Sequence, residues 1–117
     1  MLAVMKFGGS SVADLGKIRN VAERCIKKWK DGNQVIVVLS AMGKTTDGLI
    51  SQAQQITDMP SRREMDMLLS TGEQVSVSLM AMTMLQMGVP AISLNAWQVA
   101  MHTTSAYQNA KLKRIDT

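Results

Sequence analysis

The residues best suited to chemistry lie close to the N-terminus. Lys6 is followed in close succession by Gly8, Gly9, Ser10 and Ser11. Glycines let a backbone approach an anion closely, free N–H groups can point at it, and a following helix N-terminus adds partial positive charge. A lysine at this place can hold a cation against transferring phosphate oxygens. The segment therefore indicates a phosphate site, although a plain tight turn between a strand and a helix has the same local pattern.

A second set of polar residues follows the next apolar run. Ser40, Thr45 and Thr46 lie in a segment, residues 40–46, that we call the hydroxyl loop; residues 8–11 are the glycine loop. In open parallel sheets, ligands bind outside the carboxyl ends of the strands, so we expect both loops at one edge of a sheet. Thr46 or Asp47 could instead start a helix as its cap. A capping loop can also bind a ligand, so both roles stay open.

A single carboxylate, Glu73, stands directly behind Gly72. We expect it at a helix N-terminus in otherwise apolar surroundings. There it could bind a cationic group of a ligand, or it could simply be a favourable residue of a first helical turn.

Alternating strands and helices must position these residues. Residues 2–5 are an apolar run typical of a short buried strand, and the continuous β-branched run 35–39 is typical of a strand buried on both faces of a parallel sheet. Between them, apolar residues recur at helical spacing from Leu15 to Trp29, and Asp14 can cap that helix. Two strands joined by a helix form a βαβ unit, so the fold class is α/β.

Helices are also predicted for the middle of the chain. One carries the apolar residues between Leu49 and Ile56, and a capping box at 61–64 starts the next. We expect residues 70–74 to interrupt that helix and a further helix to run from Val75 to Gly88. Additional strands are expected at 89–94 and from Lys111 to Ile115.

Composition restricts the class of protein. The 117 residues, 46% hydrophobic and 19% charged, suit one globular domain. No apolar run approaches the roughly 20 residues of a membrane span, and a secretory signal layout is missing, so no membrane association is expected. The single cysteine, Cys25, suggests a core residue in a reducing, cytoplasmic location. With His102 as the sole histidine, we predict no protein metal site.

The net charge of +4 raises the possibility of nucleic-acid binding. Aromatic residues make up only 3% of the chain, which leaves little for stacking on bases. Six of the 13 basic residues form two small groups on separate elements, which is typical of solvated faces, and we therefore expect no nucleic-acid partner. These groups are Lys27, Lys28 and Lys30, and Lys111, Lys113 and Arg114.

Three segments together resemble the aspartate kinases of the amino-acid kinase superfamily. They are residues 6–12, 40–47 and 63–74, of which the last is the most specific. The resemblance extends from Met5 to Thr117 and implies a three-layer αβα sandwich with a mainly parallel sheet. Residues 1–117 would then be the N-terminal part of the kinase domain, with the regulatory domains absent. Two segments depart from the family pattern, residues 95–100 and 103–111.

The resemblance also implies an activity. Aspartate kinases use ATP, with Mg²⁺ bound through the nucleotide, to convert L-aspartate to 4-phospho-L-aspartate on the way to lysine, threonine and methionine. Family members are several times longer, so we expect this chain to be inactive alone. The resemblance also implies that the full-length form is a homo-oligomer. A non-catalytic module that binds nucleotide or pairs with a full-length subunit is the alternative.

Carried over residue by residue, the resemblance gives each candidate a role. The residues implied to hold the ATP phosphates are Lys6, Gly8, Gly9 and Ser10, and Lys6 would be catalytic. Those implied to bind the aspartate substrate are Ser40, Thr45, Thr46 and Glu73, the last through the ammonium group.

Overall fold

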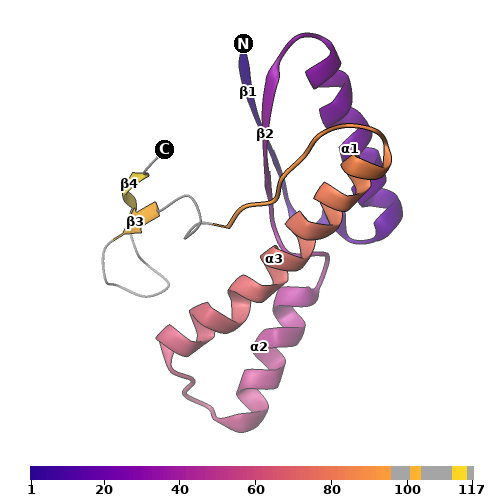
Figure 1. Cartoon of the computed structure of the whole chain (residues 1–117). Helices are drawn as coiled ribbons and strands as arrows, with labels where there is room; N and C mark the ends of the chain where they lie inside the picture. Colours follow the sequence, from indigo (N-terminus) through magenta and orange to yellow (C-terminus); the bar gives the residue numbers. More distant parts are fainter. Residues whose placement is uncertain (96–100, 104–111, 116–117) are drawn as a thin grey trace.

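The computed structural model describes residues 1–95, 101–103 and 112–115 (Figure 1). In chain order the elements are strand β1 (Leu2–Phe7), a 3-10 turn η1 (Gly9–Val12), helix α1 (Leu15–Lys30), strand β2 (Gln34–Leu39), helix α2 (Thr45–Ile56), helix α3 (Arg62–Gln86), and strands β3 (Met101–Thr103) and β4 (Leu112–Ile115). None of the described helices combines the length and apolarity needed to cross a membrane.

Strands β1 and β2 are parallel neighbours, and α1 connects them. Their register pairs Leu2 with Gln34 and Phe7 with Leu39, so both strands end at the same edge. The Asp14 carboxylate accepts a hydrogen bond of 2.8 Å from the Lys17 N–H, which confirms the predicted cap of α1. The α/β class and the parallel pairing are thus confirmed, while β3 and β4 pair antiparallel.

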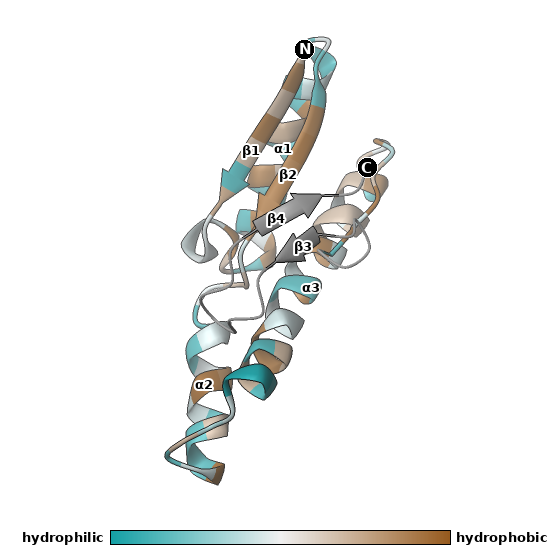
Figure 2. Ribbon diagram, turned by 90° about the vertical axis from the view of Figure 1, so that its left-hand side faces the viewer, coloured by the Kyte–Doolittle hydropathy of each residue, from teal (hydrophilic) through white to brown (hydrophobic). Residues whose placement is uncertain are grey.

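The two faces of the parallel sheet differ in exposure. One face packs on α1 (Figure 2), whereas on the other face Ile36 and Val38 are 50% and 44% exposed, and Leu2 and Val4 of β1 are exposed as well. The prediction that residues 35–39 are buried on both faces is therefore wrong for the described residues. Successive side chains of a strand point to opposite faces, so a helix layer on one side buries only every second residue.

The hydrophobic core lies between the inner face of the sheet, α1 and the C-terminal half of α3. It contains Phe7 and Leu39 from the strand ends, together with apolar residues of both helices. The helical members are Ile18, Val21, Ala22, Cys25, Ile26, Met80 and Met84. This core fixes the ends of β1 and β2, where the candidate residues lie, relative to α3.

Cys25 is a core residue, as predicted, and only 2% of its surface is exposed. Burial raises the pKa of its thiol, and the charge of the neighbouring Arg24 lowers that pKa to a smaller extent. Below its unfolded-state pKa the thiol is protonated in both states. Above it, the unfolded state releases the proton first and is stabilised.

We therefore expect the free energy of unfolding to fall as alkaline pH rises from the unfolded-state pKa of Cys25 through its raised folded-state pKa. Urea denaturation as a function of pH measures this. The Cys25→Ala variant is the control, because its curve should lack the thiol's contribution. If the free energy of unfolding changed equally with alkaline pH in the parent protein and in Cys25→Ala, the contribution assigned to the Cys25 thiol would be wrong.

Helix α3 is continuous from Arg62 to Gln86, so the predicted interruption at residues 70–74 is wrong. The Ser70 and Thr71 hydroxyls donate hydrogen bonds of 2.8 and 2.7 Å to carbonyl oxygens one turn earlier, at Met67 and Leu68. These polar side chains are therefore satisfied inside the helix and do not break it. The predicted helix start at Ser61 is confirmed, since its side chain accepts a hydrogen bond from the Glu64 N–H, while the Glu64 carboxylate pairs with Arg63.

Residues 89–94 have no regular secondary structure, so the strand predicted there is not present. A strand requires a hydrogen-bonded neighbour, and β1 and β2 pair only with each other among the described strands. Strand β4 falls inside the segment 111–115, where a strand was expected. The departures at 95–100 and 103–111 lie almost wholly outside the described residues.

Candidate functional site

The glycine loop follows β1 directly, as the sequence predicts. Gly8 precedes the single turn η1, and its carbonyl accepts a hydrogen bond of 3.1 Å from the Ser11 N–H. Gly8 and Ser10 are exposed, and the exposed Lys6 lies one residue before the end of β1. The strand, glycine turn and helix start therefore follow one another in the order that a phosphate-binding loop requires.

The hydroxyl loop lies directly against the glycine loop. The Gly43 N–H donates a hydrogen bond of 2.9 Å to the Gly9 carbonyl, and the Ser40 N–H donates one of 3.2 Å to the Phe7 carbonyl. A Cβ atom added to Gly9 would lie 2.9 Å from the Ala41 carbonyl oxygen, so only glycine allows this approach. The two loops thus share one sheet edge, as predicted.

Helix α3 reaches the same place through Gly72, which is buried. A Cβ atom added to Gly72 would lie 2.9 Å from the Ala41 Cβ and 3.3 Å from the Thr45 Cγ2. Ala41 is only 5% exposed and contacts both Gly9 and Gly72. The three sequence motifs therefore meet at Ala41.

Sequence reasoning did not assign a role to Ala41. The available indication was its small size, in a loop that follows a buried strand and precedes a glycine. A larger side chain there would separate α3 from the loops.

Thr45 and Thr46 are the first residues of α2. The residue that precedes the helix is Lys44, and no side chain caps it, so the capping role considered for Thr46 and Asp47 is not realised. Neither threonine hydroxyl forms a hydrogen bond with another described residue. Thr45 is exposed and Thr46 half-buried, at the end of the hydroxyl loop where α2 begins.

Glu73 lies in the interior of α3 and is exposed, so the expected helix N-terminus and apolar surroundings are both wrong. The cause is the continuity of α3 through residues 70–74. Its carboxylate forms no ion pair or hydrogen bond within the described part of the chain. Gly72 packs against Ala41 and Thr45, and Glu73 is the next residue along the chain. The backbone of Glu73 therefore lies close to the hydroxyl loop.

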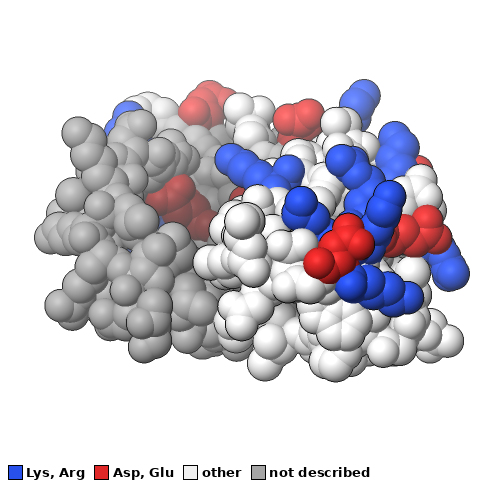
Figure 3. Space-filling view, turned by 90° about the horizontal axis from the view of Figure 1, so that it is seen from above, with Lys and Arg blue, Asp and Glu red and all other residues white. Residues whose placement is uncertain are grey.

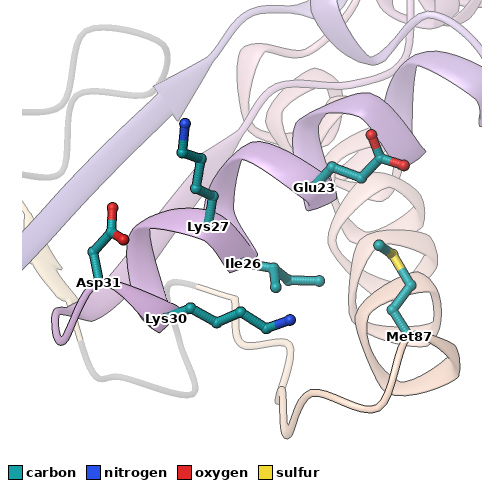
Figure 4. Close-up of a pocket in the computed structure, with 6 residues that line it drawn as sticks. All are labelled: Glu23, Ile26, Lys27, Lys30, Asp31 and Met87. Atoms are coloured by element: carbon teal, nitrogen blue, oxygen red, sulfur yellow. The ribbon is translucent and has the colours of Figure 1, made fainter.

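Two open hollows lie on the described surface, and neither encloses this set of residues. The larger, about 440 Å³, lies between α1 and the end of α3 and is lined by Glu23, Ile26, Lys27, Lys30, Asp31 and Met87 (Figure 4). It contains none of the predicted site residues. The smaller, about 240 Å³, includes Ser10 alone among them. Ala41 and Gly72 line neither hollow.

The comparison with known proteins places this geometry in a family. The pattern of the amino acid kinase family matches residues 1–117. The chain belongs to the amino acid kinase family. Its curated relatives include aspartokinase of Geobacillus stearothermophilus, 52% identical over 116 residues, and aspartokinase 2 of Bacillus subtilis, 51% identical over 116 residues. Each alignment covers 99% of this chain but 28% of the relative, so the chain spans just over a quarter of their length.

Solved structures of aspartate kinases share the fold. The enzyme from Synechocystis superposes with a TM-score of 0.83 and 52% sequence identity, over 85% of this chain and 17% of the other. Aspartokinase III of E. coli, solved in complex with aspartate and ADP, gives a TM-score of 0.83 at 21% identity, over 97% of this chain and 35% of the other. The latter likeness establishes the fold alone. The amino acid kinase fold and the similarity to aspartate kinases, both expected from the sequence, are confirmed.

Proposed function

We propose that this chain forms part of an aspartate kinase that transfers the γ-phosphoryl group of ATP to the side-chain carboxylate of L-aspartate. A carboxylate oxygen forms the new bond to phosphorus, the bond to the bridging oxygen breaks, and ADP leaves with 4-phospho-L-aspartate as the second product. The observation that carries the proposal is the junction at Ala41, which joins the glycine loop, the hydroxyl loop and α3. The proposal is also supported by the sequence of the chain, which is about half identical to those of two aspartokinases.

In this proposal the glycine loop and Lys6 hold the phosphates of ATP. Gly8 and Gly9 let the nucleotide approach the backbone, and Ser10 adds a hydroxyl donor. Lys6 supplies a cation from the end of β1. Charge spreads over the phosphoryl oxygens in the transition state, so a fixed cation there stabilises it more than it stabilises the ground state.

The aspartate substrate is proposed to bind across the hydroxyl loop. Ser40, Thr45 and Thr46 would donate hydrogen bonds to its carboxylates, and Glu73 would bind its ammonium group. The nucleophile is a carboxylate that is already ionised at neutral pH, so the reaction needs no general base. Catalysis then consists of positioning two anions and neutralising the charge between them.

Mg²⁺ is assigned to the phosphates of ATP rather than to side chains of this chain. Within the described residues, no group of three or more His, Cys, Asp and Glu side chains could hold a metal ion. Bound to ATP, Mg²⁺ supplies charge neutralisation at the phosphate oxygens. The protein's own contribution there is Lys6 and the backbone of the glycine loop.

The biological setting is part of the same proposal. The product would lead towards lysine, threonine and methionine in the cytoplasm, and the complete enzyme would be a homo-oligomer without a nucleic-acid or membrane partner. The chain alone is proposed to be inactive, since it spans 28% of the aspartokinase relatives. The second candidate is a non-catalytic module that binds nucleotide or pairs with a full-length subunit.

A chimera tests the proposal. Residues 1–117 replace the matching segment of the Geobacillus stearothermophilus aspartokinase, and hydroxylamine traps acyl phosphate formed from ATP, Mg²⁺ and aspartate. We expect aspartate-dependent hydroxamate from the chimera and none from the 117-residue chain alone. A folded but inactive chimera would contradict the proposed kinase role and favour the non-catalytic module.

Glu73→Gln in the chimera is expected to raise the KM for aspartate and leave the KM for ATP unchanged. Losing one partner of a charged hydrogen bond costs about 1.5–3 kcal/mol, and for an exposed carboxylate we expect the lower end, about a tenfold increase. Steady-state kinetics with each substrate varied measure this. Glu23→Gln, the same change on the exposed surface of α1, is the control. A rise in the KM for ATP alone would exclude the ammonium role.

A further inference from the structure

The smaller hollow lies between the glycine loop and one face of α1. Its volume is about 240 Å³, and its lining consists of Ser10, Ser11, Lys17, Asn20, Val21 and Arg24. All but Val21 carry hydrogen-bond donors. Of the residues to which the kinase proposal assigns ATP phosphates, Ser10 lines it, whereas Lys6, Gly8 and Gly9 do not.

The spacing along α1 explains why these side chains converge. Lys17, Asn20 and Arg24 are separated by three and four residues, which places them on one face of the helix. Turn η1, which carries Ser10 and Ser11, contacts α1 directly. The hollow therefore lies between η1 and α1, which pack directly against each other.

Its electrostatics favour an anion. No carboxylate lines the hollow, and neither Lys17 nor Arg24 forms an ion pair with a carboxylate of the described residues. The nearby acidic residues of α1 are engaged elsewhere. Asp14 caps the helix through the Lys17 N–H, and Glu23 lies 3.6 Å from the Arg19 guanidinium. Figure 3 shows the molecule from above, where Lys and Arg side chains gather on one side with acidic side chains among them.

Arg24 is held in place by the core. Its guanidinium carbon lies 5.3 Å from the centre of the Phe7 ring, and Phe7 is buried at the end of β1. A cation over an aromatic face is attracted by the ring, and the planar guanidinium keeps its edge N–H groups available for hydrogen bonds. A side chain held in this way loses less conformational entropy when an anion binds.

We infer that this hollow is a binding site for a phosphate group. A tetrahedral oxyanion can accept hydrogen bonds from the two serine hydroxyls, the Asn20 amide and the Arg24 fork while Lys17 balances its charge. The group could belong to inorganic phosphate or to a nucleotide, and the recognition chemistry is the same. The inference does not rest on the proposed kinase reaction, which gives Lys17, Asn20 and Arg24 no role.

The test is an NMR titration of the ¹⁵N-labelled 117-residue chain with inorganic phosphate at constant ionic strength. We expect saturable shifts of the Ser10 and Ser11 amides and of the Arg24 side-chain N–H. Arg24→Gln and Lys17→Gln should each weaken binding about tenfold, the cost of one exposed charge-assisted contact. Lys28→Gln removes the same charge from α1 outside the hollow and should leave the affinity unchanged. Far-UV circular dichroism verifies that each variant is folded.

A second titration with Mg²⁺-free ATP separates the two sources. If ATP shifts the same resonances and Arg24→Gln weakens the binding of ATP, the site takes a nucleotide phosphate. If ATP shifts Gly8, Gly9 and Ser10 but not Arg24, while inorganic phosphate still shifts Arg24, the site takes free phosphate. Non-saturable shifts with both ligands, or equal losses in Arg24→Gln and Lys28→Gln, would overturn the inference. An inactive chimera would not affect it.

Discussion

Lys6→Ala is expected to lower the kcat of the chimeric kinase by about 10²–10³-fold, the usual effect of removing one electrostatic group that stabilises a transition state. The side chain is exposed near the end of β1 and is not part of the hydrophobic core, so folding should change little. The loss should appear in kcat more than in the KM for aspartate, because charge on the phosphoryl oxygens develops during transfer. Hydroxamate formation at saturating substrates measures it.

The matched control is Lys28→Ala, which removes a lysine from the exposed surface near the end of α1. It should retain the kcat of the parent chimera. Lys6→Arg refines the result, since it keeps the charge but alters its position and shape. Unchanged turnover in Lys6→Ala would remove Lys6 from the mechanism and leave the glycine loop, through its backbone and the Ser10 hydroxyl, as the proposed phosphate contact from this segment.

Gly72→Ala is expected to destabilise the chain and to lower kcat/KM of the chimera by about 10²-fold. Its new Cβ would lie 2.9 Å from the Ala41 Cβ, so α3 or the hydroxyl loop must move. Such overpacking costs about 1–3 kcal/mol, and a displacement of about 1 Å at a reacting site can cost 10²-fold in rate. Thermal denaturation and the hydroxamate assay measure the two effects.

Gly48→Ala is the matched control for this substitution. Gly48 also lies inside a helix, α2, but a Cβ added there meets nothing within 4 Å. Alanine should therefore stabilise α2 by up to about 1 kcal/mol, the opposite sign to Gly72→Ala. The double variant Gly72→Ala with Ala41→Gly removes the facing Cβ and should recover part of the loss. Stabilisation by Gly72→Ala would show that α3 does not pack on Ala41.

Most of the secondary structure could be predicted because its determinants are local. Asp14 caps α1 with an oxygen placed three residues before the N–H that it binds, and the apolar stripe of that helix is visible from its spacing alone. The parallel pairing of β1 and β2 follows from the helix between them. The same reasoning brought the glycine and hydroxyl loops to one sheet edge.

The segment around Glu73 shows where local reasoning was insufficient. Ser70, Thr71 and Gly72 together resemble a helix break. The two hydroxyls, however, donate hydrogen bonds to carbonyl oxygens one turn earlier, and Gly72 gives α3 the room to pack against Ala41. Whether a glycine breaks a helix or lets it approach another segment depends on that segment, which here is about thirty residues away in the chain. Glu73 therefore lies inside a helix and is exposed.

The sequence by itself determined the α/β class, the strand–glycine loop–helix order and the residue types of the candidate site. It did so because caps, turns and periodicity act between neighbouring residues. Only the tertiary structure decided that the motifs meet at Ala41, that one sheet face is open, and that Lys17 and Arg24 share a hollow with Ser10. These features arise from packing between segments that are distant in the chain, which depends on how side-chain volumes fit together in three dimensions.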